Sequence, residues 1–208
     1  MNQLSLPKTA QYDPEDAKQL VRSAIRAHRK ERADAVLQEA SEHLVEHVLR
    51  FVDGMHCVAC YVSVNKEPPT RTLCTAIADA GIQLLLPKLG PRLTRSWGYF
   101  RGDADLQTMA PGRPPEPTGP AFDNSILAHV DAMIIPALTV NAAGERLGQG
   151  GGWYDRALKE IGPHTKVAAL LFSDEFVHDP LPQDGLDVRV PFVITPDGVF
   201  PTAAARRL

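Results

Sequence analysis

The sequence predicts an α/β fold in which a mainly parallel sheet is flanked by helices and preceded by an N-terminal helical hairpin. Five short apolar runs, rich in Val, Ile and Leu, indicate buried strands at residues 58–62, 82–86, 132–135, 167–171 and 192–194. Helical patterns at residues 70–80 and 153–161 fall between these runs, and such alternation is typical of a parallel sheet covered by helices. With 208 residues and no internal repeat, we expect one domain spanning residues 1–208.

Two long helices are predicted ahead of the first strand. The sequence Asp13-Pro14-Glu15 is typical of a helix start, because it supplies an N-cap acceptor, a proline at the first helical position and an acid in the first turn. This helix should end near residue 32, and a second should run from residue 34 to about residue 51, before Gly54. The first helix carries a basic stripe at four-residue spacing, made of Lys18, Arg22, Arg26 and Lys30. The pattern alone is typical of a solvated helix face.

Composition argues against several classes of partner. The formal net charge is −3 and the pI is about 6.2, so no general positive field draws the chain to nucleic acid or to an anionic membrane. No run approaches the ~20 apolar residues of a membrane span, and the N-terminus lacks the pattern of a signal peptide. Three cysteines are too few for a disulfide framework. We therefore expect a cytoplasmic protein with no nucleic-acid or membrane partner. As a separate expectation, which composition does not decide, the protein is a monomer.

Cys57 and Cys60 form a C-x-x-C pattern, which can indicate a zinc or redox site. No second pair or histidine cluster accompanies them. Because residues three apart on a strand point to opposite faces, we interpret them as two partly buried strand thiols.

Residues 111–120 contain five prolines and two glycines. Such a segment should form a stiff loop without strand or helix. Its role is open between a wall of the active site and a simple crossover.

A glycine-rich loop at residues 148–152 is the strongest candidate for a ligand site. It follows the predicted strand at 132–135 and precedes a predicted helix, and loops at the carboxyl ends of parallel strands are where ligands bind. Gly148, Gly150, Gly151 and Gly152 allow sharp turns that bring successive backbone N–H groups toward an anion. The loop matches neither the P-loop nor the dinucleotide pattern, because Trp153 stands where those patterns require Lys or Gly.

The residues around this loop suggest a phosphate ligand with a metal ion. Asp155 would repel a phosphate unless a divalent cation lay between them, which makes it a candidate Mg²⁺ ligand. Arg146 is placed to pair with phosphate charge. Trp153 and Tyr154 are equally consistent with core packing and with stacking on a heterocycle.

Residues 144–156, Gly-Glu-Arg-Leu-Gly-Gln-Gly-Gly-Gly-Trp-Tyr-Asp-Arg, resemble the hallmark G-x-R-L-G-x-G-G-G-Y-Y-D-R of 5-formyltetrahydrofolate cyclo-ligases. Weaker matches follow the order of that family along almost the whole chain. They are Lys18 with Arg22, the E-x-x-T element at residues 67–70, Glu116-Pro117, and the closing segment 181–195. The sequence departs from the family pattern at Trp153, at Asn141, where many members have Asp, and at Leu186, where a His is usual.

The resemblance implies a role for each matched residue. The ATP-binding residues would be Lys18, Arg22, Arg146, Leu147, Gly148, Gln149, Gly150, Gly151, Gly152, Trp153 and Tyr154. The folate-binding residues would be Val62, Glu67, Gln149, Gly150, Gly151, Gly152 and Trp153. The Mg²⁺ ligands would be Asp155 and Asp187, with Asp184 and Asp179 as alternatives to Asp187.

The implied reaction is the ATP- and Mg²⁺-dependent closure of 5-formyltetrahydrofolate to 5,10-methenyltetrahydrofolate, with release of ADP and phosphate. Phosphorylation would turn the formyl oxygen into a leaving group, so no covalent protein nucleophile is expected. Two alternatives share the scaffold: an isomerase of sugar phosphates with Glu67 as its base, and a non-catalytic nucleotide or phosphate sensor.

Overall fold

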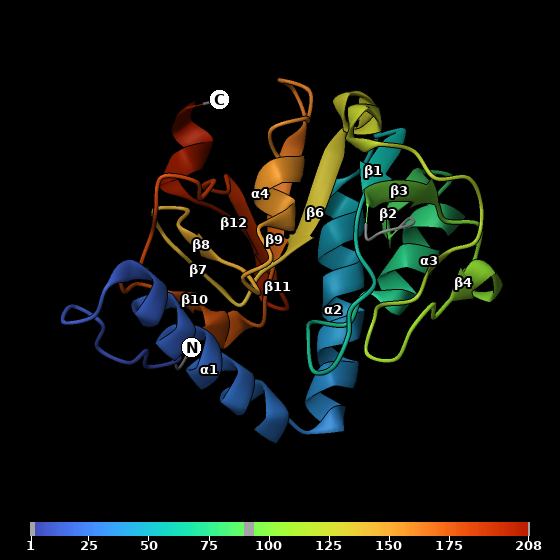
Figure 1. Cartoon of the computed structure of the whole chain (residues 1–208). Coiled ribbons are helices and arrows are strands. Elements are labelled where there is room, and N and C mark those ends of the chain that lie inside the picture. Colours follow the sequence, from blue (N-terminus) through green and yellow to red (C-terminus); the bar gives the residue numbers. More distant parts are fainter. Residues whose placement is uncertain (1–2, 90–93, 208) are drawn as a thin grey trace.

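A seven-stranded sheet forms the centre of the computed structural model, which describes residues 3–89 and 94–207 (Figure 1). Its strands lie in the order β12-β11-β9-β6-β1-β2-β3. Their bounds are β1 (Cys57–Ala59), β2 (Gln83–Leu89), β3 (Arg95–Tyr99), β6 (Ala132–Pro136), β9 (Lys166–Leu170), β11 (Phe192–Thr195) and β12 (Gly198–Pro201). The five central strands run parallel, and β3 and β12 are antiparallel edges. The predicted fold class, a mainly parallel sheet flanked by helices, is confirmed.

Helices cover both faces of this sheet because the parallel strands are apolar on both sides. On one face, α2 (Asp34–Phe51) contributes Ala40, Leu44 and Val48 to a core that includes α3 (Arg71–Asp79). On the other face, α4 (Trp153–Ala157) and the 3₁₀ helix η3 (Asn124–His129) cover a second core. In the part of the chain that the structure describes, the other 3₁₀ turns are η2 (Asp103–Asp105), η4 (Ser173–Glu175) and η5 (Ala203–Arg207). None of the helices among the described residues is long and apolar enough to cross a membrane.

The first helix, α1 (Pro14–Glu31), begins as the sequence indicates. The side chain of Asp13 accepts hydrogen bonds from the backbone N–H groups of Glu15 and Asp16, at 3.0 and 3.1 Å. The two N-terminal helices are therefore where they were predicted, but they pack on different partners. Figure 1 shows α1 and α2 diverging from their short link, α1 toward a small second sheet and α2 along the large sheet.

The small sheet was not predicted from the sequence. It contains β7 (Thr139–Asn141), β8 (Arg146–Leu147) and β10 (Phe176–Val177) in the order β10-β7-β8. Val21 and Ile25 of α1 pack on Leu138 and Leu147, at and beside this sheet. Strands of two or three residues are too short to show a periodic pattern, which explains why they were missed.

Three predicted segments differ from the structure. The strand predicted at 58–62 ends at Ala59, and the following residues form a buried loop. The helix predicted at 153–161 ends at Ala157. In the proline-rich segment the prediction of no strand was wrong, because β5 (Glu116–Pro117) pairs with β4 (Leu106–Gln107). A strand of two residues tolerates proline because it lies at an edge.

The interpretation of the C-x-x-C pattern as two partly buried strand thiols holds for Cys57, whereas Cys60 is fully buried and follows the end of β1. Cys57 packs in the core on one face of the large sheet and Cys60 in the core on the other, and both thiols are free. Among residues 3–89 and 94–207, no cluster of three or more Cys, His, Asp or Glu side chains forms a metal centre.

Candidate active site

The glycine loop, residues 148–152, connects β8 to α4 at the carboxyl edge of the large sheet. Gly150 adopts a φ of +100°, which side chains rarely accept, and a Cβ there would lie 3.3 Å from the guanidinium carbon of Arg22. At Gly148, a Cβ would lie 2.8 Å from Nη1 of Arg146. Glycine at these two positions therefore lets arginines approach the backbone closely.

Arginines hold the carbonyl groups of this loop. Arg22 donates from Nε to the carbonyl of Gly148 at 3.1 Å, and Arg26 donates from Nη2 to that of Gln149 at 3.1 Å. The carbonyl of Gly151 accepts from Arg95 and Arg156. In contrast, the N–H groups of residues 148–152 donate to no described residue. A loop whose carbonyls are occupied and whose N–H groups are unpaired is suited to bind an anion.

Lys18 lies on α1 beside this loop, and it is buried although the sequence pattern suggested a solvated face. Only 3% of Lys18 is exposed, and its ammonium lies 2.7 Å from Oδ2 of Asp184 and 2.5 Å from Oδ2 of Asp187. Burial alone would lower the pKa of Lys18, but its hydrogen bonds to the two carboxylates outweigh burial and raise that pKa. Lys18 is therefore a fixed cation. Arg26 and Lys30 of the same stripe are exposed, as predicted.

Arg22 is also buried, at 6% exposure, and its Nη1 lies 3.0 Å from Oε1 of Glu15. The hydrogen bonds of Arg22 to Glu15 and to Gly148 join the start of α1 to the glycine loop. In the predicted basic stripe, Lys18 therefore contacts the acids of the closing segment, Arg22 and the exposed Arg26 contact the glycine loop, and Lys30 is exposed.

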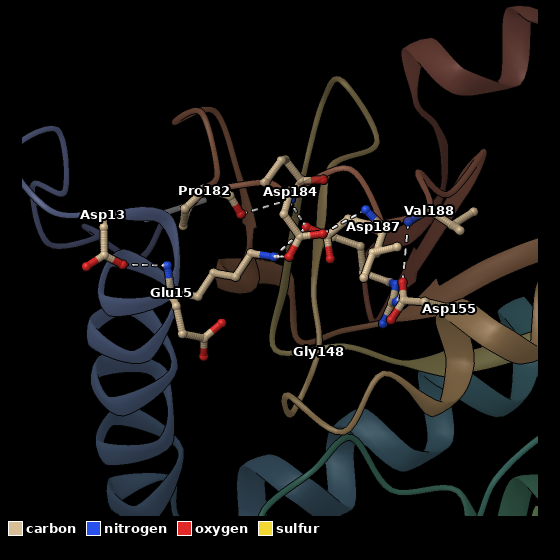
Figure 2. A network of polar contacts seen from close by, with 12 residues as sticks. Asp13, Glu15, Gly148, Asp155, Pro182, Asp184, Asp187 and Val188 are labelled. Atoms are coloured by element: carbon tan, nitrogen blue, oxygen red, sulfur yellow. Dashed lines mark hydrogen bonds and ion pairs between the residues drawn. The ribbon is translucent and has the colours of Figure 1, made fainter.

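Arg146 and Asp155 form an ion pair at the other side of the loop. Nη2 of Arg146 lies 2.5 Å from Oδ1 of Asp155, which also accepts from the backbone N–H of Val188 at 3.3 Å. Nε of Arg146 is buried without a described partner. Figure 2 shows Asp184 and Asp187 next to each other, with Asp155 beyond them beside Val188.

The acids of the closing segment differ in position. Asp184 donates its backbone N–H to Oδ2 of Asp187 at 2.8 Å, so the two form one turn around Lys18. The hydrogen bond from Lys18, followed by one from the backbone N–H of Leu186, lowers the pKa of Asp184. Asp179 contributes its backbone carbonyl to Asn141, and its side chain makes no hydrogen bond to a described residue.

Glu67 lies beside Gln149, the second residue of the glycine loop, which donates from Nε2 to Oε1 of Glu67 at 3.1 Å. Its other oxygen, Oε2, accepts from the N–H of Val64 at 3.0 Å. Thr70 closes the loop at residues 61–70, which carries Glu67, by donating from Oγ1 to the carbonyl of Tyr61 at 2.7 Å. Val62, by contrast, is buried at 5% exposure in the core below the loop.

The two aromatic residues after the loop both pack against the core. Trp153 stacks on Tyr154 with ring centroids 5.6 Å apart and lies 5.9 Å from the ring of Trp97. Burial raises the pKa of the Tyr154 phenol well above its ordinary value. Nε1 of Trp153 is buried without a described partner. The core interpretation is therefore supported, and stacking on a ligand stays a prediction.

Sequence reasoning missed the ion pair that anchors α1. Arg29 donates from Nε and Nη2 to the two oxygens of Glu175, both at 2.7 Å, and from Nη2 to the carbonyl of Ala137 at 2.8 Å. Arg29 is 4% exposed and Glu175 is fully buried. A signal existed, because Arg29 lies seven residues after Arg22 and so on the same helix face, but its partner is 146 residues away.

Comparisons with known proteins agree on one family. The model of the 5-formyltetrahydrofolate cyclo-ligase family matches residues 14–196. The 5-formyltetrahydrofolate cyclo-ligase of Mycolicibacterium smegmatis is 30% identical over 186 residues, covering 86% of this chain and 94% of the relative. That of Escherichia coli K12 is 27% identical, covering 87% of this chain and 99% of the relative.

Solved structures show the same fold. The 5,10-methenyltetrahydrofolate synthetase of Aquifex aeolicus superposes with a TM-score of 0.74 at 24% identity, covering 88% of this chain and 92% of that one. The synthetase of Mycoplasma pneumoniae superposes with a TM-score of 0.65 at 17% identity, covering 88% and 98%.

Proposed function

Because the chain belongs to the 5-formyltetrahydrofolate cyclo-ligase family, we propose that it closes 5-formyltetrahydrofolate to 5,10-methenyltetrahydrofolate and consumes ATP. The observation that carries this proposal is the set of contacts around the glycine loop. The N–H groups of this loop are unpaired toward described residues, Arg22 holds the carbonyl of Gly148 at its start, and Glu67 accepts a hydrogen bond from the side chain of the next residue, Gln149. This arrangement suits a reaction between a phosphate donor and a second substrate.

The N–H groups of residues 148–152 and the cations Lys18, Arg22 and Arg146 would bind the ATP phosphates. Each of these cations already pairs with an acid, Lys18 with Asp184 and Asp187, Arg22 with Glu15 and Arg146 with Asp155. The site is therefore close to neutral before ATP arrives. A bound phosphate would replace the carboxylates as the partner of these cations. The carboxylates would then need a new positive charge beside them.

Magnesium is the ion that this donor set fits. The ammonium of Lys18 already lies between two carboxylates, as a metal cation would. Asp155 is joined to the same segment, because it accepts a hydrogen bond from the backbone N–H of Val188, the residue after Asp187. Mg²⁺ commonly uses one or two carboxylates together with phosphate oxygens, so Asp155 and Asp187 would suffice as protein ligands. When bound, Mg²⁺ would neutralise charge on the transferring phosphoryl group. Asp184 and Asp179 are the alternatives to Asp187. Asp184 hydrogen-bonds to Asp187, whereas the side chain of Asp179 makes no hydrogen bond to a described residue.

The chemistry requires positioning and charge stabilisation from the protein. The formyl oxygen attacks the γ-phosphorus of ATP, the bond to ADP breaks, and a phosphorylated imidate-like carbon results. The N10 amine then attacks that carbon, N10 loses its proton, and phosphate leaves with the original formyl oxygen. Lys18, Arg22 and the loop N–H groups would stabilise charge on the phosphoryl oxygens, and no protein nucleophile takes part.

The folate would lie beside Gln149, on the side of the loop that faces Glu67. Glu67 and Gln149 present a carboxylate and an amide there, which suit the polar edge of a pteridine ring. Residues 150–152 and Trp153 would contact the same substrate. Val62 would contribute from the core beneath the substrate, as a buried residue that supports the loop at residues 61–70. We infer a monomer that works in the cytoplasm, where its three thiols stay reduced.

The assay is direct. Purified protein with ATP and MgCl₂ should convert 5-formyltetrahydrofolate to a product with the longer-wavelength absorbance of the methenyl form, and no product should form without ATP. A sensor would bind ATP without any such change, and an isomerase would act on a sugar phosphate instead. Absence of an absorbance change under all conditions would reject the proposed activity.

A variant of Asp155 tests the metal. Asp155→Asn should remain folded and should need a higher Mg²⁺ concentration for half-maximal rate, because one carboxylate ligand is lost. Asp53→Asn serves as the matched control, since Asp53 is exposed at the end of α2 and makes no contact with this site. An unchanged Mg²⁺ titration in Asp155→Asn would remove Asp155 from the ligand set.

A further inference from the structure

Two arginines meet at one carbonyl oxygen on the rim of the glycine loop. Arg95, the first residue of β3, donates from Nη2 to the carbonyl of Gly151 at 3.1 Å. Arg156, in α4, donates from Nη2 to the same oxygen at 2.8 Å. The two Nη2 atoms are therefore no farther apart than the sum of these two distances. Two positive charges from different elements are held side by side at the mouth of the candidate site.

Neither of these arginines has an acid within ion-pair distance among the described residues. This separates them from the buried cations Lys18, Arg22 and Arg146, each of which pairs with a carboxylate. Like charges this close repel each other unless an anion lies between or beside them. Each guanidinium has five N–H donors, so most of the donors of this pair remain free for a ligand.

The position of the pair indicates which anion it binds. Lys18, Arg22 and Arg146 contact the start of the loop and the acids beyond it, whereas Arg95 and Arg156 contact Gly151, near its end. The guanidinium carbon of Arg95 lies 5.9 Å from the ring centroid of Trp153. Arg156 is exposed and Arg95 half-buried, so the pair opens to solvent. An anionic group that extends out of the site beside an aromatic ring would meet it.

We propose that Arg95 and Arg156 bind the carboxylates of the glutamate tail of the folate substrate. The proposal rests on the proposed function, because that substrate carries an α- and a γ-carboxylate at the end remote from its pteridine ring. The planar fork of a guanidinium matches a carboxylate with two parallel hydrogen bonds. A folate with several linked glutamates offers more carboxylates and should gain affinity from the same pair.

The test compares folates with one and three glutamates in Arg95→Gln and Arg156→Gln. We expect each substitution to raise the KM for 5-formyltetrahydrofolate about tenfold, as expected for the loss of one charge-assisted contact, with little change in kcat. The advantage of the triglutamate should disappear in the double variant. Arg101→Gln is the matched control, because Arg101 is an exposed arginine beyond the opposite end of β3. Its KM values should equal those of the unmodified protein.

A second measurement needs no turnover. p-Aminobenzoyl-triglutamate, which carries the tail without the pteridine ring, should bind the unmodified protein and quench tryptophan fluorescence, because Trp153 lies beside Arg95. Its dissociation constant should rise at least tenfold in the double variant. Failure of cyclisation in the unmodified protein would reject the proposed function, and this binding arm would still report on the arginine pair.

Two results would overturn the inference. A higher KM for ATP with an unchanged KM for folate would assign the pair to a phosphate group. The second result would be that the ratio of the KM values for the mono- and triglutamate is the same in the unmodified protein and in every variant, and that all of them bind the tail analogue equally well. It would show that the arginine pair binds no carboxylate of the tail.

Discussion

At the scale of single residues, the buried cations of the candidate site are already neutralised by acids. Lys18 shows this most clearly, since it is 3% exposed and bound to two carboxylates. Separating a buried cation from its carboxylates costs free energy. A phosphate that binds the cation offsets this cost only if a metal ion binds the carboxylates that are left behind. Binding of ATP and of Mg²⁺ should therefore be mutually dependent.

Lys18→Met should lower kcat/KM for ATP about 10- to 100-fold, because one charge-assisted contact with phosphate is lost. Lys30→Met is the control, since Lys30 belongs to the same helix and the same stripe but is exposed. Steady-state kinetics with varied ATP measure the effect. Equal kcat/KM in both variants would mean that Lys18 has only a structural role.

Cys57 supplies a pH-dependent prediction. Burial, with a smaller contribution from Asp131, raises the pKa of its thiol to about 11. Because the thiolate is the nucleophile, alkylation of Cys57 at pH 8 should be about 100-fold slower than that of an ordinary cysteine, and its rate should still rise above pH 10. Because the pKa of Cys57 is raised in the folded state, folding favours the protonated thiol. The stability that this preference contributes is present below the pKa of the unfolded chain and is lost as the pH rises toward 11.

Iodoacetamide labelling followed by mass spectrometry measures that rate, and Cys57→Ser identifies the labelled site, since Cys60 and Cys74 are buried. A rate that reaches its plateau by pH 9 would show that the Cys57 thiol is not shielded.

At the scale of elements, the position of α1 decides the geometry of the site. Its apolar contacts are few, and Arg29 fixes its second half to Glu175 and to the carbonyl of Ala137. Burial raises the pKa of Glu175, although Arg29 favours its charged form. A buried pair of this kind contributes mainly by holding one arrangement, and breaking it is costly.

Glu175→Gln should lower the free energy of unfolding by about 3–5 kcal/mol and should raise the KM for ATP, because α1 carries Lys18 and Arg22. The exposed pair Arg50–Glu46 provides the control, since Glu46→Gln should cost less than about 1 kcal/mol. Urea denaturation measures both. Equal midpoints for the two variants would contradict the anchoring role.

The long elements could be predicted from the sequence, and the short ones could not. A proline after an N-cap aspartate marks the start of α1, and 18 residues give each of the first two helices a clear period. The strands of the small sheet are too short for any period, and their pairing depends on contacts across the chain. For the same reason the helix pattern could identify Lys18 and Arg22 as one stripe but not as buried groups, since their partners lie up to 169 residues away.

At the scale of the whole molecule, four distant segments meet at the carboxyl edge of the sheet. They are the start of α1, the loop at residues 61–70, the glycine loop and the acidic turn at residues 184–187. The hallmark motif could locate only one of them with certainty from sequence. Their convergence brings the cations Lys18 and Arg22 and the acid Glu67 to the start of one loop, which is the basis of the proposed transfer.

The most direct test follows the formyl oxygen. If this oxygen attacks the γ-phosphorus, 5-formyltetrahydrofolate labelled with ¹⁸O in the formyl group should yield phosphate that carries one ¹⁸O atom per molecule of methenyl product, as measured by mass spectrometry. Label released into water, with unlabelled phosphate, would contradict transfer of a phosphoryl group to the folate at this site.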